Sequence, residues 1–192
     1  MKSSSRLVLL LSLLAFAPRA KAQDVTPRFE AYAGYDYTRF NVNANVPGIA
    51  PSAAYNGNGG SGQIEYNVNH WLGAVADLGG LVATSSGNGA FAGAAFTYLF
   101  GPRANFRLGK ITPFAQVFFG GIRTTDGIAR STGTENNFAM TAGGGIDFEL
   151  SQHVSVRPAQ AEYFMTKIPD GLNNRQNNFR YSAGITFLCG RQ

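Results

Sequence analysis

The chain has 192 residues, of which 16 are basic and 11 acidic, with two histidines and a single cysteine. This length allows about one domain, and one cysteine, Cys189, excludes an intrachain disulfide and a thiolate metal site. Four of the 16 basic residues and no acid precede residue 23, so the rest of the chain carries 12 basic and 11 acidic residues, a net charge of +1. Nucleic-acid binding, which needs a concentrated basic face, is therefore not expected.

The first 22 residues have the organisation of a secretory signal peptide. Lys2 and Arg6 precede an apolar run over residues 7–17, and residues 20–22 have the small-x-small pattern of a cleavage site. A transmembrane helix needs about 20 apolar residues, whereas Pro18 and the charges after it end this run. We therefore expect residues 1–22 to be a signal peptide that is removed on export, and residues 23–192 to form one mature domain.

The mature chain is patterned for β-strands. After residue 28, apolar residues recur with period two in segments separated by clusters of Gly, Asn, Ser and Pro. Eight strands are predicted: Phe29–Phe40, Gly60–Asn69, Trp71–Thr84, Gly89–Gly101, Ile111–Arg123, Asn136–Glu149, Val154–Thr166 and Asn177–Leu188. The fold class is thus all-β, and an even strand count suits a closed antiparallel up-and-down barrel.

The connections between these strands alternate in kind. One end of the barrel has the connections around His70, at Pro102–Lys110 and at Leu150–His153. The other end has those at Asn41–Gly59, Ser85–Asn88, Thr124–Glu135 and Lys167–Gln176. Apart from the second connection of each set, the first end is short and the other long. Because outer-membrane barrels have short periplasmic turns and longer extracellular loops, this pattern favours a transmembrane barrel with a periplasmic N-terminus.

The two faces of the strands differ in chemistry. In the sixth strand Phe138, Ile146 and Phe148 share one face, and Asp147 lies on the other. A soluble barrel of eight strands could not bury such charges without a large desolvation cost, so a lipid-facing apolar outside and a polar interior are expected. The residues predicted for this lumen network are Glu30, Asp36, Glu65, Asp77, Asp147, Arg157 and Arg180. Strict alternation puts Arg157 and Glu162 on opposite faces, so both point inward only with a bulge near Pro158.

Aromatic residues near the strand ends are predicted to form two girdles at the membrane surfaces. The girdle residues are Trp71, Phe138, Phe148, Phe179 and Phe187. Phe138 and Phe148 lie ten positions apart, which corresponds to about 25 Å along a tilted strand, the height of the apolar band of such barrels.

A signal peptide, eight strands, alternating loop lengths and an aromatic-rich last strand together resemble the small barrels of the outer membrane protein A and X families. The resemblance implies a place in the outer-membrane bilayer. The last strand, Phe179–Phe187, is similar to the C-terminal signal by which the barrel assembly machinery recognises its clients. It departs from that pattern because the chain continues through Leu188 to Gln192.

Sites for chemistry are not predicted. Gly57, Gly59 and Gly62 form a G-x-G-x-x-G pattern, but neither the preceding apolar strand nor the following helix of a dinucleotide site is present, so no cofactor is expected. His70 and His153 fall in the short turns, the wrong end for an enzyme acting on the outer leaflet. We therefore expect no catalytic residue, no cofactor-binding residue and no metal ligand.

The function indicated is a structural or surface-interaction role in the outer membrane, through membrane integrity or adhesion, without a wide pore. An extracellular partner would meet the loops, of which the first is rich in Asn and Gly and the third carries Arg123, Asp126, Arg130 and Glu135. Narrow ion conduction stays open. The alternatives are a secreted soluble β-barrel that binds a small apolar ligand and a lipid-modifying outer-membrane enzyme.

Overall fold

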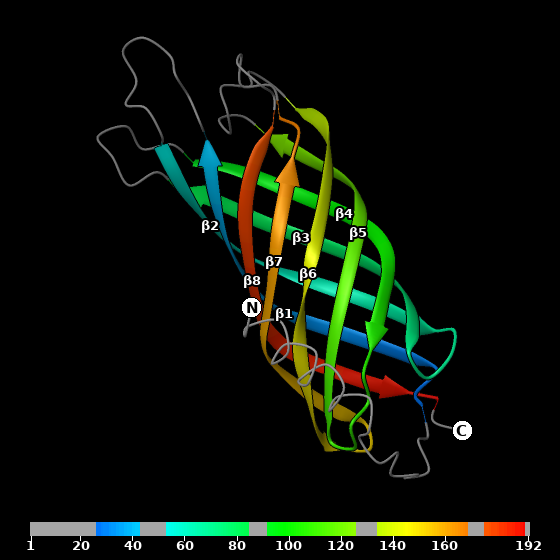
Figure 1. Ribbon diagram of the computed structural model, residues 1–192. Coiled ribbons are helices and arrows are strands. Elements are labelled where there is room, and N and C mark those ends of the chain that lie inside the picture. Colours follow the sequence, from blue (N-terminus) through cyan, green and yellow to red (C-terminus); the bar gives the residue numbers. More distant parts are fainter. Residues whose placement is uncertain (1–25, 43–52, 85–91, 126–133, 169–174, 191–192) are drawn as a thin grey trace, which may run out of the picture.

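The computed structural model describes residues 26–42, 53–84, 92–125, 134–168 and 175–190, which form a closed antiparallel barrel (Figure 1). Its strands are β1 (Phe29–Val42), β2 (Ala53–Asn67), β3 (Leu72–Thr84), β4 (Ala92–Asn105), β5 (Ile111–Thr125), β6 (Glu135–Ser151), β7 (Val154–Thr166) and β8 (Gln176–Cys189). Each strand pairs with its neighbours in sequence, and β1 also pairs with β8, which closes the ring. The eight-stranded up-and-down barrel predicted from the sequence is confirmed. Within the described ranges no helix is long and apolar enough to cross a membrane.

Most strand boundaries lie close to those predicted, and β7 matches at both ends. The prediction that Val68, Asn69 and Trp71 belong to strands is wrong, because β2 ends at Asn67 and β3 begins at Leu72. The side-chain oxygen of Asn69 accepts hydrogen bonds from the backbone N–H groups of Trp71 at 2.9 Å and Leu72 at 2.8 Å. A side chain that bonds the backbone in this way favours a turn over a continued strand.

Two predicted connections are too long. Residues 53–59, assigned to the first loop, belong to β2, and residues 102–105, assigned to a connection, belong to β4. The β4–β5 pairing skips Gly101 and Pro102 and resumes at Arg103 and Gln116 in the same register. Proline has no N–H to donate, so it leaves a gap in the ladder here without ending the strand. Residues 43–52, 85–88, 126–133 and 169–174 of the predicted loops lie outside the described residues. So do residues 89–91, which were predicted to begin the fourth strand, and the predicted signal peptide.

A β-bulge interrupts β7 near Pro158, where the sequence requires one if Arg157 and Glu162 are both to point inward. Arg157 pairs with Gly184 of β8, and the next paired residue, Gln160, lies opposite Ser182, so β7 contains one extra residue. Pro158 and Ala159 are both exposed on the outside, between the inward-pointing Arg157 and Gln160. The bulge thereby resets the alternation of β7.

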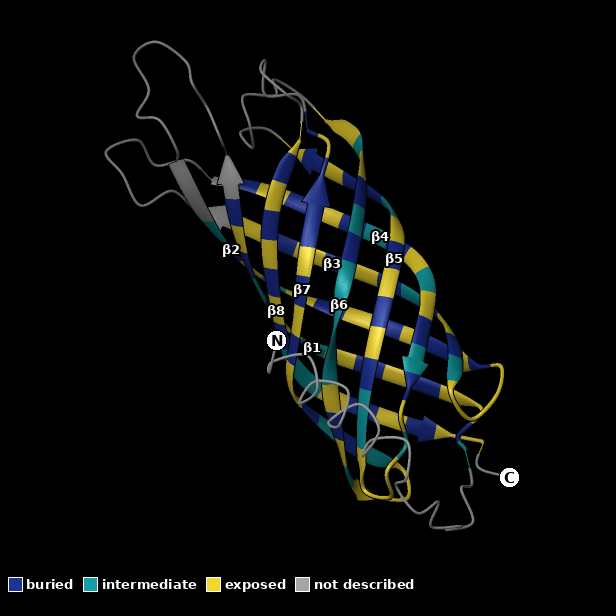
Figure 2. Ribbon diagram, in the orientation of Figure 1, coloured by how far each residue is buried: buried dark blue, intermediate teal, exposed yellow. Residues whose placement is uncertain are grey.

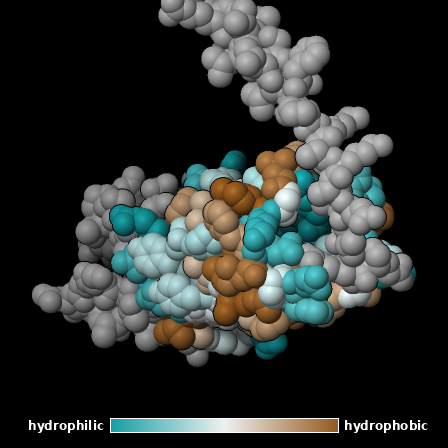
Figure 3. All heavy atoms as spheres, turned by 90° about the horizontal axis from the view of Figure 1, so that it is seen from below, coloured by the Kyte–Doolittle hydropathy of each residue, from teal (hydrophilic) through white to brown (hydrophobic). Residues whose placement is uncertain are grey.

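The strands alternate between buried and exposed residues along most of their length (Figure 2). The exposed positions carry large apolar side chains, among them Ile64, which is 63% exposed, and Phe100, which is 55% exposed. In Figure 3, apolar residues form a band across the middle of the visible face, with hydrophilic residues on both sides of it. A soluble barrel would keep these side chains inside, so the surface is that of a barrel surrounded by lipid.

Two glycines make room for one aromatic ring inside the barrel. Gly34 of β1 lies directly opposite Gly184 of β8. A Cβ atom at Gly34 would overlap the hydroxyl group of Tyr32, and one at Gly184 would approach the Tyr32 ring to 2.8 Å. Both positions therefore require glycine if the Tyr32 ring is to lie flat against the inner wall, in the crowded interior of an eight-stranded barrel.

Candidate functional site

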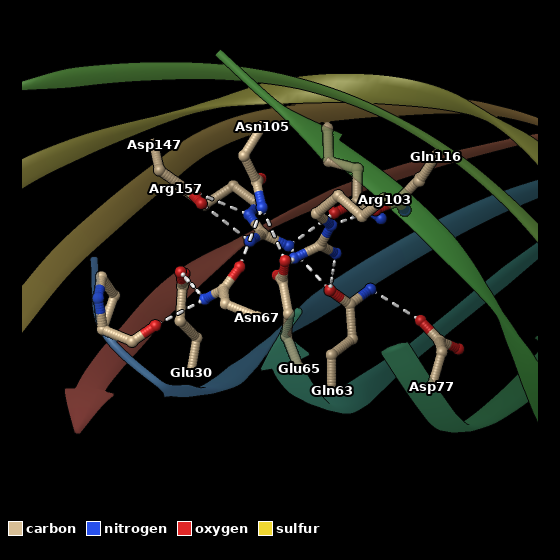
Figure 4. A network of polar contacts seen from close by, with 12 residues as sticks. Glu30, Gln63, Glu65, Asn67, Asp77, Arg103, Asn105, Gln116, Asp147 and Arg157 are labelled. Carbon is tan, nitrogen blue, oxygen red and sulfur yellow. Dashed lines mark hydrogen bonds and ion pairs between the residues drawn. The ribbon is translucent and has the colours of Figure 1, made fainter. Parts of the chain in front are cut away.

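The barrel interior holds a connected network of charged and amide side chains (Figure 4). Near the end with the short turns, Arg107 Nη2 lies 2.6 Å from Glu30 Oε1 and donates to Asn67 Oδ1 at 3.1 Å. Asn67 in turn donates to Glu30 at 2.8 Å. Asn105 continues the chain of contacts by donating to Glu65 Oε1 at 2.6 Å. These contacts join β1, β2 and β4 across the interior.

Arg103 lies at the centre of the network. Its Nη1 atom is 2.7 Å from Glu65 Oε2, its Nε donates to Gln116 Oε1 at 2.7 Å, and its Nη2 donates to Gln63. The side chain is 1% exposed, so the guanidinium has been taken out of water. Burial of a charge is tolerable only when its hydrogen-bonding groups are satisfied, and these contacts from β2 and β5 meet that condition.

Arg157 forms a bidentate ion pair with Asp147 of the adjacent strand β6. Its Nε and Nη2 atoms donate to the two carboxylate oxygens at 2.7 and 2.9 Å. Its Nη1 atom donates to Gln63 and to Gln160, both at 2.8 Å. The guanidinium also lies 4.3 Å from the centre of the Tyr32 ring, so its aromatic neighbour adds a cation–π contact.

Arg180 links two further carboxylates. Its Nη2 atom lies 2.6 Å from Glu162 Oε2 and 3.2 Å from Asp77 Oδ2. Gln116 donates to the other oxygen of Glu162 at 2.8 Å, and Gln63 donates to Asp77 at 2.7 Å. The two amides thus connect the Arg180 cluster to Arg103 and Arg157, and the ion pairs form one continuous network.

All the residues predicted for the lumen network lie inside the barrel and are at most 6% exposed. Six of them take part in ion pairs: Glu30, Glu65, Asp77, Asp147, Arg157 and Arg180. Asp36 is the exception, because none of the ion pairs found in the described part of the chain includes it and its Oδ1 atom lacks a hydrogen-bond partner there.

Several residues of the network were not expected from the sequence. Arg103, Asn105 and Arg107 all fall in the connection predicted at Pro102–Lys110, whereas in the structure Arg103 and Asn105 belong to β4 and only Arg107 lies in the turn. Gln63 and Gln116 carry no charge and are not among the residues predicted for the network. The alternation of polar and apolar residues along their strands could have placed both side chains in the interior.

The half of the interior nearer the long loops contains a cluster of large apolar side chains, which the sequence pattern does not predict. Continuing along the inward faces, Phe118 follows Gln116 and Phe164 follows Glu162, and both side chains are 0% exposed. We define the apolar cluster as Phe40, Leu81, Leu99, Phe118, Ile122, Phe164 and Ile168. Gln176 holds the backbone of Ile168 by donating to its carbonyl at 2.8 Å and accepting from its N–H at 3.0 Å. The polar interior expected from the sequence therefore describes the ion-paired network, and the apolar cluster departs from it.

A small cavity lies at the short-turn end of the network. It has a volume of about 20 Å³, enough for about one water molecule. Its lining residues are Glu30, Arg107, Thr112, Asp147, Glu149, Ser155 and Leu188. No group of three or more metal-ligating side chains occurs among the residues that the structure describes.

The aromatic girdle residues, the two histidines and the glycines of the G-x-G-x-x-G pattern all lie outside the network. The predicted girdle residues are exposed on the outside: Trp71 (49%), Phe138 (41%), Phe148 (39%), Phe179 (46%) and Phe187 (51%). His70 lies in the β2–β3 turn and His153 in the β6–β7 turn, both at the short-turn end. Gly57, Gly59 and Gly62 lie in the middle of β2, with no helix after them.

This closed barrel with an apolar outside and an ion-paired inside defines a small eight-stranded membrane barrel. The chain belongs to the outer membrane protein beta-barrel domain family, whose model matches residues 7–187. It is a protein of the cell outer membrane, and a soluble barrel is thereby excluded.

Solved structures show the same fold at low sequence identity. Neisserial surface protein A superposes with a TM-score of 0.60 at 13% identity, over 83% of this chain and 96% of that one. The outer membrane protein OprG from Pseudomonas aeruginosa superposes with a TM-score of 0.54 at 10% identity, over 84% and 95%. No curated protein sequence matches this chain significantly. At these identities the likeness concerns the fold alone.

Proposed function

We propose that the protein is a non-porous structural and surface-interaction barrel of the outer membrane, and not an enzyme. The observation that carries this proposal is the filled interior. Arg103 and Arg157 of the network and Leu99 and Phe118 of the apolar cluster are each at most 1% exposed. An eight-stranded barrel has only enough width for such side chains, so little space is left for solute to pass.

The orientation of the barrel supports a role at the cell surface. The first and last described segments of the chain meet at the short-turn end, where Arg28 N–H donates to the Gly190 carbonyl at 3.2 Å. We place this end in the periplasm, since short turns are periplasmic in such barrels. The long connections then face the exterior, where a membrane-integrity or adhesion role would be exercised.

Export and assembly form part of the same proposal. Residues 1–22 would direct secretion and be cleaved, which leaves residues 23–192 as the mature domain. Residues 179–187 lie within β8, where Phe179, Tyr181, Ile185 and Phe187 alternate on the outside. This outward aromatic and aliphatic row would be the feature that the barrel assembly machinery recognises.

Conductance measurements test the proposal directly. Purified mature protein, reconstituted in planar bilayers, is expected to show no steady channel current above that of protein-free membranes. A general porin reconstituted in the same way serves as the positive control. Stable single-channel steps from the folded protein would overturn the non-porous assignment. Deleting residues 43–52 and 126–133 and measuring adhesion of whole cells tests the surface role separately.

A further inference from the structure

The buried charges of the barrel interior do not balance. Within the part of the chain that the structure describes, the buried carboxylates are those of Glu30, Asp36, Glu65, Asp77, Asp147 and Glu162. The cations that face these six carboxylates are the four arginines of the network, Arg103, Arg107, Arg157 and Arg180. Six negative charges against four positive ones leave an excess of two negative charges. Burying a charge that nothing offsets is costly, so the interior favours a further positive charge.

The excess is concentrated around Asp36. Its side chain is 4% exposed, and among the described residues no ion pair includes it. Arg180 lies two positions along β8 from Ser182, the residue that pairs with Asp36. Each nitrogen of the Arg180 guanidinium already donates to Glu162 or Asp77. One guanidinium charge is therefore shared by two carboxylates before Asp36 is counted.

Hydroxyl groups lie on both sides of the Asp36 carboxylate. Asp36 pairs with Ser182 across β1 and β8, and the Cβ atoms of directly opposite residues are about 5 Å apart. Ser61 lies on the inward face of β2, two positions from Gly59, which pairs with Asp36. Both hydroxyl groups lie near the carboxylate. Asp36 Oδ1, Ser61 Oγ and Ser182 Oγ are all buried, and none of them has a hydrogen-bond partner among the described residues.

The hydroxyl group of Tyr32 adds a fourth oxygen nearby. It lies directly over Gly34, since a Cβ atom at that position would overlap it, and Gly34 pairs with Ser61. This hydroxyl is also buried and, in the described ranges, without a hydrogen-bond partner. One carboxylate and three hydroxyl groups, from β1, β2 and β8, thus face the same part of the interior. Buried polar atoms are nearly always paired, so this group of oxygens indicates a ligand.

We propose that Asp36, Ser61 and Ser182 form a binding site for one monovalent metal cation, Na⁺. Carboxylate and hydroxyl oxygens are hard donors, which suit hard cations. Only one of the three ligands is charged, whereas calcium sites commonly combine several carboxylates, so a singly charged ion fits this set better. A bound Na⁺ offsets the charge of Asp36 and gives the unpartnered oxygens a partner. The site lies between the network and the apolar cluster, to which Phe40 of the same strand belongs.

The experiment measures whether Na⁺ stabilises the folded barrel. The full mature chain, folded in phosphatidylcholine vesicles, is unfolded with urea in sodium chloride and in choline chloride at the same ionic strength. Choline is too large for the site, so it serves as the inert cation. A ligand that binds only the folded state raises the folded-to-unfolded ratio, and at an Na⁺ concentration about ten times its Kd the ratio should be about tenfold higher than in choline chloride.

Three variants locate the effect. Asp36→Asn removes the charge and keeps the size of the side chain, so its stability should be the same in both salts. The double variant Ser61→Ala with Ser182→Ala should bind Na⁺ at least about tenfold more weakly, the loss that even outer-shell partners of a metal produce. Thr124→Val is the matched control, because the Thr124 hydroxyl is also buried and unpartnered among the described residues but lies near the long-loop end of β5. It should keep the full sodium dependence.

The comparison with Asp36→Asn also separates a cation site from a carboxyl group that is protonated. With a cation site, wild type is less stable than Asp36→Asn in choline chloride, and sodium chloride narrows the difference. Equal stability of wild type in the two salts would overturn the proposal. A sodium dependence that persists in Asp36→Asn would also overturn it, since Na⁺ would then bind elsewhere. Heat-modifiable migration in gels verifies that each variant is folded before the titration.

Discussion

Arg157 and Glu162 both point into the barrel although an odd number of positions separates them on β7. Regular alternation forbids this arrangement, and the extra residue at Pro158 and Ala159 allows it. Gln160, which follows the bulge, accepts a hydrogen bond from Arg157 and donates one to Glu162. The bulge therefore places three members of the network on one inward face.

Two single-residue deletions should have unequal effects on β7. Deleting Ala159 removes the extra residue and leaves Arg157, Gln160 and Glu162 on the inside of a regular strand. After deletion of Ala161, Glu162 stays inside only if β7 loses its bulge and becomes a regular strand. In that regular strand the side chain of Gln160 points outward, toward lipid.

We expect the second deletion to lower the free energy of unfolding by about 2 kcal/mol more than the first, because a polar group is transferred out of its hydrogen bonds. Urea titration followed by the fluorescence of the single tryptophan, Trp71, measures the difference. Equal losses would show that the bulge does not set the facing of these residues.

Removing one partner of the Arg157–Asp147 ion pair should lower the free energy of unfolding more than removing both partners. Arg157→Met leaves a carboxylate buried without its bidentate partner and should lower the free energy of unfolding by about 3–5 kcal/mol. The double variant Arg157→Met with Asp147→Leu leaves no unpaired charge and should recover at least half of that loss. Urea unfolding in the same lipid measures both variants. If the double variant is as unstable as the single one, the cost arises from lost packing around Tyr32 and not from the orphaned charge.

The sequence was sufficient to predict the barrel because apolar and polar residues alternate clearly wherever one face of a strand contacts lipid and the other face lies against charged side chains. In β8, Phe179, Tyr181, Ile185 and Phe187 alternate with polar residues, and the predicted strand differs from β8 by one residue at each end. Local chemistry limited the prediction elsewhere. The connection predicted at Pro102–Lys110 begins at a proline, but in β4 this proline leaves a gap in the ladder and the pairing continues on both sides of it.

The apolar cluster could not be predicted, because its strands are apolar on both faces. In β5, Val117 and Phe119 point outward while Phe118 between them points inward. A run of apolar residues gives no period, so it does not show which half of the interior is polar. The partners within the network were equally hidden, since contacts such as Arg180 with Asp77 join strands far apart in sequence and depend on the barrel register.

The loss of stability caused by a charged residue on the outside of the barrel should depend on how deep in the membrane that residue lies. Val117 lies in the middle of β5 on the outside, and Thr125 lies on the same face at its long-loop end. Val117→Arg should lower the free energy of unfolding by about 2–4 kcal/mol, whereas Thr125→Arg should cost at most about 1 kcal/mol, because the penalty falls toward the membrane surface. Urea unfolding in lipid vesicles measures both. A larger cost at Thr125 would place the lipid band nearer the loops than the exposed aromatic residues indicate.

The apolar cluster should be the element that closes the half of the interior nearer the loops. Leu99 and Phe118 lie on adjacent strands and are both 0% exposed, so shortening both to alanine opens space that water can enter. We expect this double variant to be several kcal/mol less stable than wild type, by about 2–5 kcal/mol per site, and to show transient ion currents in planar bilayers that wild type lacks. Val117→Ala, on the lipid face of the same strand, is the matched control and should not conduct. A folded double variant that remains silent would mean that the ion-paired network alone blocks the lumen.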